Sequence, residues 1–368
     1  MNVQVSRFID RVVGGLLCTL MGACSSLLPR PQKNPRTILF IKLWAMGEAI
    51  LTLPLIHAVK RQYPRAEIAV LCRERVRSVY EGDKAVDRVV SAEPASLARL
   101  LPQFQHYDLA FDCEPYLNLS ALLSWYLAKR RIGFSHGSRA ALYTDPVVFN
   151  DSQHEVLTFM DLGKRVGATG KPQSLVQLAV SQEDEARLQE VLAQAKISRK
   201  DRLLCISPSS AESGKGRIFP AAKFAEVANQ VTKKHGLKVV VVGAKSAVPV
   251  CEEVVRAITV PAINLAGQTD VKMLAAFMRK CRLTISNDSG PMHVSAAMGT
   301  PTLGIFCATT PIQYAPFGRK NSFVYNPLLP EPCIRTHLGK VNCKGHEHMS
   351  RIRVKDVVRK AEQLLRRQ

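Results

Sequence analysis

The chain has 368 residues, 46% of them hydrophobic, which excludes a disordered or fibrous protein and predicts two domains with cores of their own. Its ten cysteines are spread singly and several lie inside apolar runs, a pattern typical of buried free thiols in a reducing compartment. The net charge of +21 indicates an anionic membrane or a phosphorylated substrate as partner, or simply solvated basic faces, and no nucleic acid is expected because no nucleic-acid-binding module is visible.

The first 34 residues form an apolar and basic segment. Residues 12–28 carry no charge, but this run is short for a membrane span and is interrupted by glycine and serine. We expect an interfacial helix that brings the protein to a membrane surface. Two alternatives stay open, namely a cleaved signal that ends at Cys24 and ordinary packing on the protein.

From residue 35 onward, short apolar strands alternate with helical stretches. The first half predicts strands at 37–42, 67–72, 88–92, 108–113 and 131–134, a helix after the first strand that ends near residue 63, and a helix over 119–130. The second half predicts strands at 203–210, 238–244, 262–267, 283–289 and 302–308, and helices at 182–196, 220–235, 246–258, 270–280 and 291–298.

The predicted strands are continuous apolar runs, as in parallel sheets that helices cover on both faces. We therefore expect an α/β protein with two doubly wound, Rossmann-like domains that face a central cleft. The expected domains are 35–170 and 171–330, with a polar, helix-poor linker zone near 152–174. A basic tail, 331–368, ends in a further predicted helix.

The turn "NDSGP" (287–291) is the most specific candidate site, because ligands of such sheets bind where strands end and helices begin. Proline at the first helical position and free backbone N–H groups form an anion site that suits a diphosphate. Ser289 can add a hydroxyl, Gly290 lets the backbone approach closely, and His293 lies one turn into the helix. Asp288 fits beside a phosphate only if it binds a backbone amide or a ribose hydroxyl, or caps the helix. An ordinary capped helix with a satisfied histidine is the alternative.

A second candidate turn follows the predicted strand 203–210. Ser209 and Ser210 can donate to phosphate oxygens, and Lys215 and Arg217 can offset the charge of a diphosphate leaving group. The P-loop pattern of nucleotide triphosphatases is absent here. A solvated basic loop is the alternative for either cation alone.

The third candidate turn, "KLWAMGE" (42–48), follows the first predicted strand. Glu48 is either an acid favoured by the dipole of the helix that begins here, or a general base at a reaction centre. The local sequence does not decide between these two roles.

Taken together, the three turns resemble glycosyltransferase family 9, the heptosyltransferases of lipopolysaccharide inner-core assembly, over roughly residues 36–325. The family's opening turn is matched by Lys42, Gly47, Leu53 and Pro54, and its Lys-x-Trp-Pro turn by "RIFP" with Arg217 and Phe219. Its most diagnostic motif is matched in full by Asp288, Ser289, Gly290, His293, Gly299 and Pro301.

The resemblance implies a GT-B fold and inverting, metal-independent transfer of a heptose-type sugar, with no cofactor. The donor would be a nucleotide-diphospho-sugar such as ADP-heptose, and the acceptor an anionic, lipid-linked saccharide of the lipopolysaccharide inner core. The enzyme would be cytoplasmic and peripheral at the inner face of the bacterial inner membrane. The first domain would then bind the acceptor and the second the nucleotide sugar.

The same resemblance implies residue roles. Glu48 would be the catalytic base. The donor would be bound by Ser209, Ser210, Lys215, Arg217, Asp288, Ser289, Gly290 and His293. Weaker matches suggest acceptor contacts from Lys42, Trp44 and Gly47. A nucleotide-sugar epimerase of the same architecture and a non-catalytic binding protein remain as alternatives.

The chain departs from the family pattern at three places. The usual base is aspartate, and Glu48 reaches roughly 1.5 Å farther because of its extra methylene. Trp44 and Ala45 occupy positions that are often small hydroxyl residues, and Arg217 replaces a lysine. In the tail, Cys333, Cys343, His346 and His348 have a spacing that matches no compact zinc finger, so no metal is expected.

Overall fold

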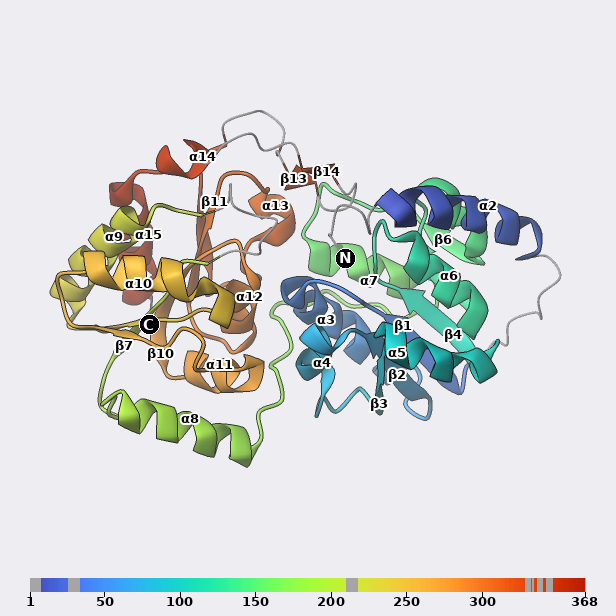
Figure 1. The fold of residues 1–368 in the computed structure, drawn as a ribbon, viewed down its shortest axis with the longest axis horizontal. Coiled ribbons are helices and arrows are strands. Elements are labelled where there is room, and N and C mark those ends of the chain that lie inside the picture. The colour runs from blue at the N-terminus through green and yellow to red at the C-terminus, as the bar shows by residue number, and fades with distance from the viewer. Residues whose placement is uncertain are drawn as a thin grey trace. The chain divides into compact units, whose positions relative to one another are not determined.

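The fold is taken from a computed structural model that describes residues 8–25, 34–209, 218–327, 332, 334–335, 340–341 and 347–367 (Figure 1). The chain divides into two compact units. Unit 1 comprises the described residues up to Pro172, and unit 2 comprises those from Gln173 onward. None of the helices in these described ranges is both long and apolar enough to span a membrane.

Unit 1 is built on a six-stranded parallel sheet in the order β3-β2-β1-β4-β5-β6. The strands are β1 (Thr37–Ile41), β2 (Glu67–Cys72), β3 (Arg88–Ser91), β4 (Tyr107–Asp112), β5 (Ala128–Phe134) and β6 (Asp145–Val147). The helices are η1 (Asp10–Gly14), α2 (Gly15–Ala23), α3 (Met46–Gln62), α4 (Glu74–Tyr80), α5 (Pro94–Leu97), η3 (Ala98–Gln103), α6 (Asn118–Leu127), η4 (Gly137–Leu142) and α7 (Glu155–Lys164).

The centre of this sheet is fully buried, because β1 lies between β2 and β4 with helices on both faces. Phe40 and Phe111 stack across the two central strands with ring centroids 4.8 Å apart. A strand buried on both faces needs apolar side chains at every position. The apolar runs of the sequence therefore marked these strands correctly.

Unit 2 repeats the architecture with a parallel sheet in the order β12-β11-β10-β7-β8-β9. Its strands are β7 (Leu203–Ser207), β8 (Lys238–Val241), β9 (Ala262–Asn264), β10 (Cys281–Asn287), β11 (Thr302–Phe306) and β12 (Ser322–Tyr325), with a separate short pair β13 (Ile334–Arg335) and β14 (Lys340–Val341). Its helices are α8 (Gln182–Gln194), α9 (Ala221–His235), η6 (Lys245–Ala247), α10 (Val248–Ala257), α11 (Val271–Met278), α12 (Gly290–Ala297), α13 (Pro311–Tyr314), α14 (Glu347–Ser350) and α15 (Val354–Arg366).

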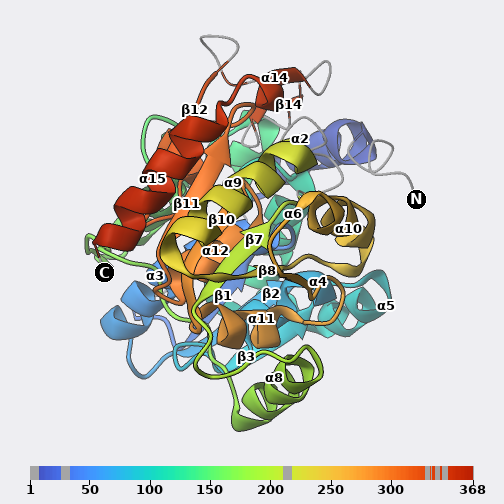
Figure 2. The same ribbon diagram turned by 90° about the vertical axis from the view of Figure 1, so that its left-hand side faces the viewer.

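The C-terminal helix α15 belongs to the core of unit 2. It lies beside α9 on the same face of the sheet, as Figure 2 shows, and it also contacts β10, β11 and β12. Val357, Val358, Ala361 and Leu364 are buried, one and two turns apart, so that one face of the helix enters the core.

The predicted fold class is confirmed, because both sheets are parallel and doubly wound. Two predicted details are wrong. The zone 152–174 contains α7, a buried ten-residue helix that packs on α3 and is capped by the His154 ring, which accepts from the Val156 amide. The polar residues on both sides of this short helix gave the whole zone the composition of a linker.

The helix predicted over 119–130 ends at Leu127, and β5 starts at Ala128. Ala128 pairs with Tyr107 of β4, so strand pairing with a distant segment overrides the helical propensity of this stretch.

Candidate active site

Both sheets have the same topology, which locates two equivalent candidate positions. Counted from the first strand of each unit, both sheets run 3-2-1-4-5-6, so β1 corresponds to β7 and β4 corresponds to β10. The order reverses between strands 1 and 4, and ligands of open α/β sheets bind outside the carboxyl ends of the strands at this switch point. The predicted site residues follow three of these four strands, namely β1, β7 and β10.

In unit 1 the switch point holds a buried ammonium group between two carboxylates. Lys42 directly follows β1, and its Nζ lies 2.6 Å from Glu48 Oε2 and 3.1 Å from Glu114 Oε2. Lys42 and Glu114 are almost completely buried, at 1% and 2% exposure, whereas Glu48 is 15% exposed. Glu48 is therefore the member of this group that reaches solvent.

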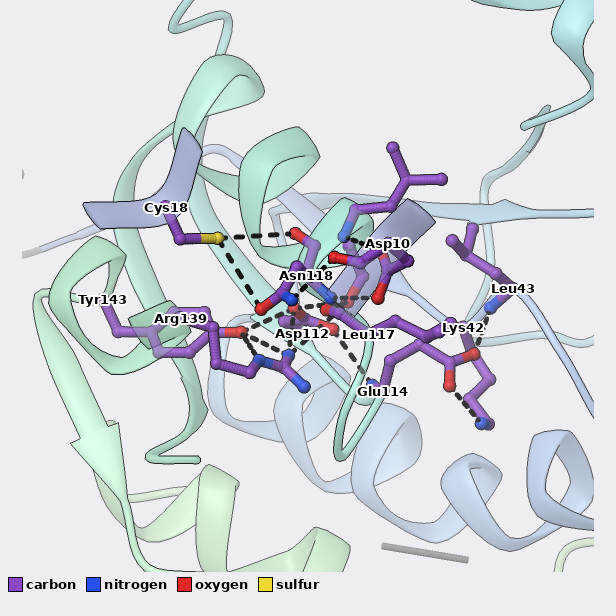
Figure 3. A network of polar contacts seen from close by, with 12 residues as sticks. Asp10, Cys18, Lys42, Leu43, Asp112, Glu114, Leu117, Asn118, Arg139 and Tyr143 are labelled. Carbon is purple, nitrogen blue, oxygen red and sulfur yellow. Dashed lines mark hydrogen bonds and ion pairs between the residues drawn. The ribbon is translucent and has the colours of Figure 1, made fainter. Parts of the chain in front are cut away.

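Glu114 holds the turn in place from the neighbouring strand. Its Oε1 accepts from the backbone N–H of Leu43 at 2.6 Å and of Trp44 at 2.9 Å, and Figure 3 shows it between this turn and Lys42. It follows β4, which pairs directly with β1. Three donors on one buried carboxylate fit its ionised form.

The pKa shifts of Lys42 and Glu114 agree with a cluster in which opposite charges compensate one another. Burial by itself lowers the pKa of Lys42, but the negative charges of Glu114 and Glu48 outweigh it and hold this pKa well above its ordinary value. Burial raises the pKa of Glu114 against the opposing charge of Lys42. Lys42 is thus a permanent cation beside Glu48 at neutral pH.

The backbone of this turn is strained. Ala45 precedes α3 with φ 62° and ψ 102°, a conformation that residues with a side chain rarely adopt. Strain of this kind persists only where the surroundings enforce it, and such residues cluster at functional sites. It brings Gly47 and Glu48 into the first turn of α3, where the helix dipole favours a carboxylate.

Trp44 does not form an open platform at this site. Its ring packs partly on the core of unit 1, and the guanidinium carbons of Arg73 and Arg75 lie 4.6 Å and 5.9 Å from its centroid. Of the three predicted acceptor contacts, Lys42 is enclosed by carboxylates, Trp44 is half-buried under arginines, and Gly47 is partly exposed.

In unit 2 the switch point is built from an amide, hydroxyls and a buried carboxylate. Asn287 ends β10 and links the two central loops, because its Oδ1 accepts from the Phe219 amide at 3.1 Å and its Nδ2 donates to the Pro208 carbonyl at 2.6 Å. Asp288 follows it, is buried, and accepts from the Thr309 hydroxyl at 2.7 Å. The N-cap residue of α12 is Ser289, which directly follows Asp288.

The N-cap side chain of α12 leaves the start of this helix uncapped. The Ser289 hydroxyl makes no capping hydrogen bond and lies instead 3.1 Å from Ser286 Oγ. Gly290 opens the helix with Pro291 in the first turn, and His293 is buried one turn on. Asp288, Ser289, Gly290 and His293 thus lie within one turn of a helix start, a position that favours an anion.

The loop after β7 is described only in part. Ser209 is half-buried, and the hydroxyl of Ser207, which ends β7, is buried without a hydrogen-bond partner among the described residues. The predicted donor contacts Ser210, Lys215 and Arg217 lie outside the described residues.

The sequence interpretation missed three residues of these sites, namely Glu114, Asn287 and Thr309. Glu114 left a usable signal, because it stands two residues beyond a buried strand, where parallel strands bring their ends together. Within the described residues no group of three or more His, Cys, Asp or Glu side chains is arranged to hold a metal. Cys333, Cys343 and His346 and the side chain of His348 lie outside them.

A family model described as glycosyltransferase family 9 (heptosyltransferase) matches residues 95–341, more than half of the chain. The chain belongs to this family. It is a glycosyltransferase, which confirms the predicted enzyme class. The family match includes Glu114 and the turn at Asp288, whereas Lys42 and Glu48 precede it.

Similar proteins agree with this assignment over nearly the whole chain. The lipopolysaccharide core heptosyltransferase OpsX of Haemophilus influenzae is 24% identical over 92% of this chain and 99% of its own. A Veillonella parvula family 9 glycosyl transferase has a TM-score of 0.77 at 22% identity, covering 92% of this chain and 99% of that chain. The ADP-heptose lps heptosyltransferase II of E. coli has a TM-score of 0.72 at 21% identity, covering 90% and 99%. These structures share the GT-B-type fold of this glycosyltransferase.

Proposed function

We propose that this glycosyltransferase transfers a heptose-type sugar from ADP-heptose to a lipid-linked saccharide of the lipopolysaccharide inner core. The observation that carries the proposal is Glu48, a carboxylate that reaches solvent while a buried lysine compensates its charge. The OpsX relative is named as a lipopolysaccharide core heptosyltransferase, and the E. coli structure is named for ADP-heptose. Both names support this donor and this acceptor.

In the proposed mechanism, unit 1 supplies the base. Glu48 accepts the proton of the acceptor hydroxyl, and the oxygen attacks the anomeric carbon of the donor on the face opposite the diphosphate. The bond between the anomeric carbon and the diphosphate oxygen breaks, so the configuration inverts. Lys42 and Glu114 act as positioning residues, because neither reaches solvent and each is hydrogen-bonded or ion-paired within the turn.

Unit 2 binds the donor in this proposal. The first turn of α12, with Ser289, Gly290 and His293, accepts the diphosphate, and Ser207 and Ser209 add hydroxyls from the adjacent strand end. The sequence supplies Lys215 and Arg217 in the loop after β7. Backbone dipoles and these cations offset the charge of the leaving diphosphate, so the proposed reaction needs no metal ion.

The proposal is tested by incubating the purified full-length chain with ADP-heptose and an extracted inner-core acceptor. We expect ADP release that depends on the acceptor, a product heavier by one heptose unit in mass spectrometry, and an inverted anomeric configuration by NMR. EDTA leaves the rate unchanged. ADP release without acceptor, retention of configuration, or transfer only from UDP- or GDP-sugars would each contradict the proposal.

The proposed location is the cytoplasmic face of the bacterial inner membrane, where a lipid-linked acceptor of this kind is available to a peripheral enzyme. Fractionation of cells that express the chain tests it. Recovery in the membrane fraction at low salt is expected, and recovery entirely in the soluble fraction would contradict it.

A further inference from the structure

The N-terminal helix packs on unit 1 with an inverted distribution of side chains. The helical backbone runs continuously over residues 8–23 and includes η1 and α2. Gly14, Cys18 and the Asp10 carboxylate face the protein, whereas most of its large apolar residues face outward. A helix of a soluble protein normally buries its large apolar face instead.

Small residues let this helix approach unit 1 closely. A Cβ added at Gly14 would lie 2.8 Å from Asn118 Cβ, and one added at Gly22 would lie 2.7 Å from Ala141 Cβ. Cys18 lies between these glycines and is fully buried. Close approach through small residues, with large apolar residues on the other side, is how helices pack inside membranes.

Asp10 fixes the helix by a specific polar contact. Its carboxylate accepts from the backbone N–H of Asn118 at 3.1 Å and of Leu119 at 2.8 Å, and its own carbonyl accepts from Asn118 Nδ2 (Figure 3). It thereby caps α6, whose N-cap residue Leu117 has no side chain that can do so. The helix is therefore docked in a defined orientation on unit 1.

The outward face is a continuous apolar stripe. Its large side chains are between 41% and 67% exposed and comprise Phe8, Ile9, Val12, Val13, Leu16, Leu17 and Leu20. Leaving seven such side chains of one short helix in water is unfavourable unless another apolar phase covers them.

Charge and length indicate which phase that is. In the first 36 residues Asp10 is the single acidic residue, and it faces inward, whereas five Lys or Arg residues remain. A helix over residues 8–23 is about 24 Å long, shorter than the hydrocarbon core it would have to cross. Such a segment suits the plane of an anionic membrane interface.

We propose that this stripe inserts into the surface of an anionic lipid bilayer and anchors unit 1 there, parallel to the membrane plane. This proposal specifies how the protein reaches the membrane location proposed above. It rests on the proposed function only because a lipid-linked acceptor lies at a bilayer. The docking itself requires neither the donor nor the acceptor. Its failure is thus distinguishable from failure of sugar transfer.

The test is vesicle flotation of the full-length chain with phosphatidylglycerol/phosphatidylethanolamine vesicles and with phosphatidylcholine vesicles. Wild type is expected to float with the anionic vesicles. The double variant Leu16→Ser/Leu20→Ser, which keeps all charges, is expected to lose binding by at least about tenfold, because two apolar side chains no longer enter the interface.

A matched control removes two exposed aliphatic side chains elsewhere in unit 1. Leu101→Ser/Val148→Ser changes residues that are 66% and 78% exposed and is expected to float like wild type. Both double variants should keep the far-UV circular dichroism and melting temperature of wild type, since they alter only exposed positions.

Three outcomes would overturn the proposal. The stripe variant could float like wild type, the control variant could lose binding equally, or wild type could fail to float with anionic vesicles. A wild-type dimer that the stripe variant converts to a monomer, with unchanged flotation, would identify a second copy of the chain as the occupant. Sedimentation velocity in the absence of lipid decides this last case.

Discussion

The two switch points have the same strand topology but carry different functional groups. In unit 1, the residues after strands 1 and 4 are Lys42 and Glu114, which form a charged cluster with Glu48. In unit 2, the equivalent strand ends carry a serine hydroxyl, an amide and a helix start. The backbone fold thus provides two similar positions, and a few side chains decide what each can do.

The helices that follow strand 4 differ in the same sense. The N-terminus of α6 is occupied by the Asp10 carboxylate, which comes from the N-terminal helix. The equivalent helix α12 has no such side-chain cap from its N-cap residue Ser289. A carboxylate of the chain itself caps the start of α6, and we propose that the start of α12 binds an external anion. We therefore propose that the unit 1 position accepts a proton and that the unit 2 position binds an anion.

The largest effect is expected for Glu48→Gln, which removes the proton acceptor with little change in shape. Turnover should fall by about 10³-fold, within the range for loss of a general base. Nucleotide binding by unit 2, measured as the ADP-induced shift in melting temperature, should stay unchanged. Glu48→Asp serves as the control, with a loss of about 10²-fold or less because the carboxylate is kept but displaced. Wild-type turnover in Glu48→Gln would refute the assignment of the base.

Lys42→Met breaks the charged cluster from the other side. It leaves Glu114 buried without its cation, and removal of one partner from a buried pair costs about 3–5 kcal/mol. Urea denaturation of the full chain measures this loss in the free energy of unfolding. The double variant Lys42→Met/Glu114→Gln should recover a large part of it, whereas simple additivity of the two changes would mean that they are not coupled.

Asp288→Asn tests the unit 2 position. The carboxylate accepts a hydrogen bond from Thr309 and lies beside the start of α12. The change should weaken ADP binding by roughly tenfold, since the neutral amide accepts the Thr309 hydrogen bond more weakly than the carboxylate and holds this turn less firmly. Isothermal titration calorimetry measures this, with Glu48→Gln as the matched variant that binds ADP normally. Equal loss of ADP affinity in both variants would show that ADP binding does not distinguish the unit 2 position from the unit 1 position.

Asp10→Ala removes the cap that distinguishes α6 from α12. The expected cost is about 1 kcal/mol of unfolding free energy, typical of a lost N-cap. Ser181→Ala, which removes the N-cap of α8 in unit 2, is a control of similar size away from the N-terminal helix. Asp10→Ala should also raise the protease sensitivity of residues 8–23, and unchanged sensitivity would show that the cap does not hold this helix.

The smallest effect concerns a carboxylate at the opposite, amino-terminal end of the unit 1 sheet. Burial alone raises the pKa of Asp108, but the backbone N–H groups of Arg36 and Thr37 and the cation of Lys129 outweigh it and lower this pKa. A lowered folded-state pKa contributes stability above the unfolded value near 3.9, and this contribution disappears as the pH falls through the folded-state pKa.

Asp108→Asn should therefore cost about 1 kcal/mol at pH 7 and progressively less below about pH 4. Denaturation of wild type and variant across this range measures the difference. Asp108 does not lie at a switch point, so turnover should be unaffected. A cost that stays constant with pH would contradict the lowered pKa.

The sequence by itself determined the two parallel sheets and the turn at Asp288, because apolar runs and a motif of neighbouring residues are local signals. It also singled out Glu48, since an acid in the first turn of a helix after a strand is visible in a short window. The interpretation failed where partners are far apart in the chain. The pairing of Ala128 with Tyr107 converted a predicted helical end into strand.

Only the tertiary structure decided three features. It brought Glu114 to Lys42 across 72 positions, because β1 and β4 pair in parallel. It turned Asp10 toward α6, a contact across 108 positions. It also decided which face of the N-terminal helix points outward. This run is apolar on nearly all sides, so its pattern fits several orientations, and the close approach allowed by Gly14 and Gly22 selects one of them.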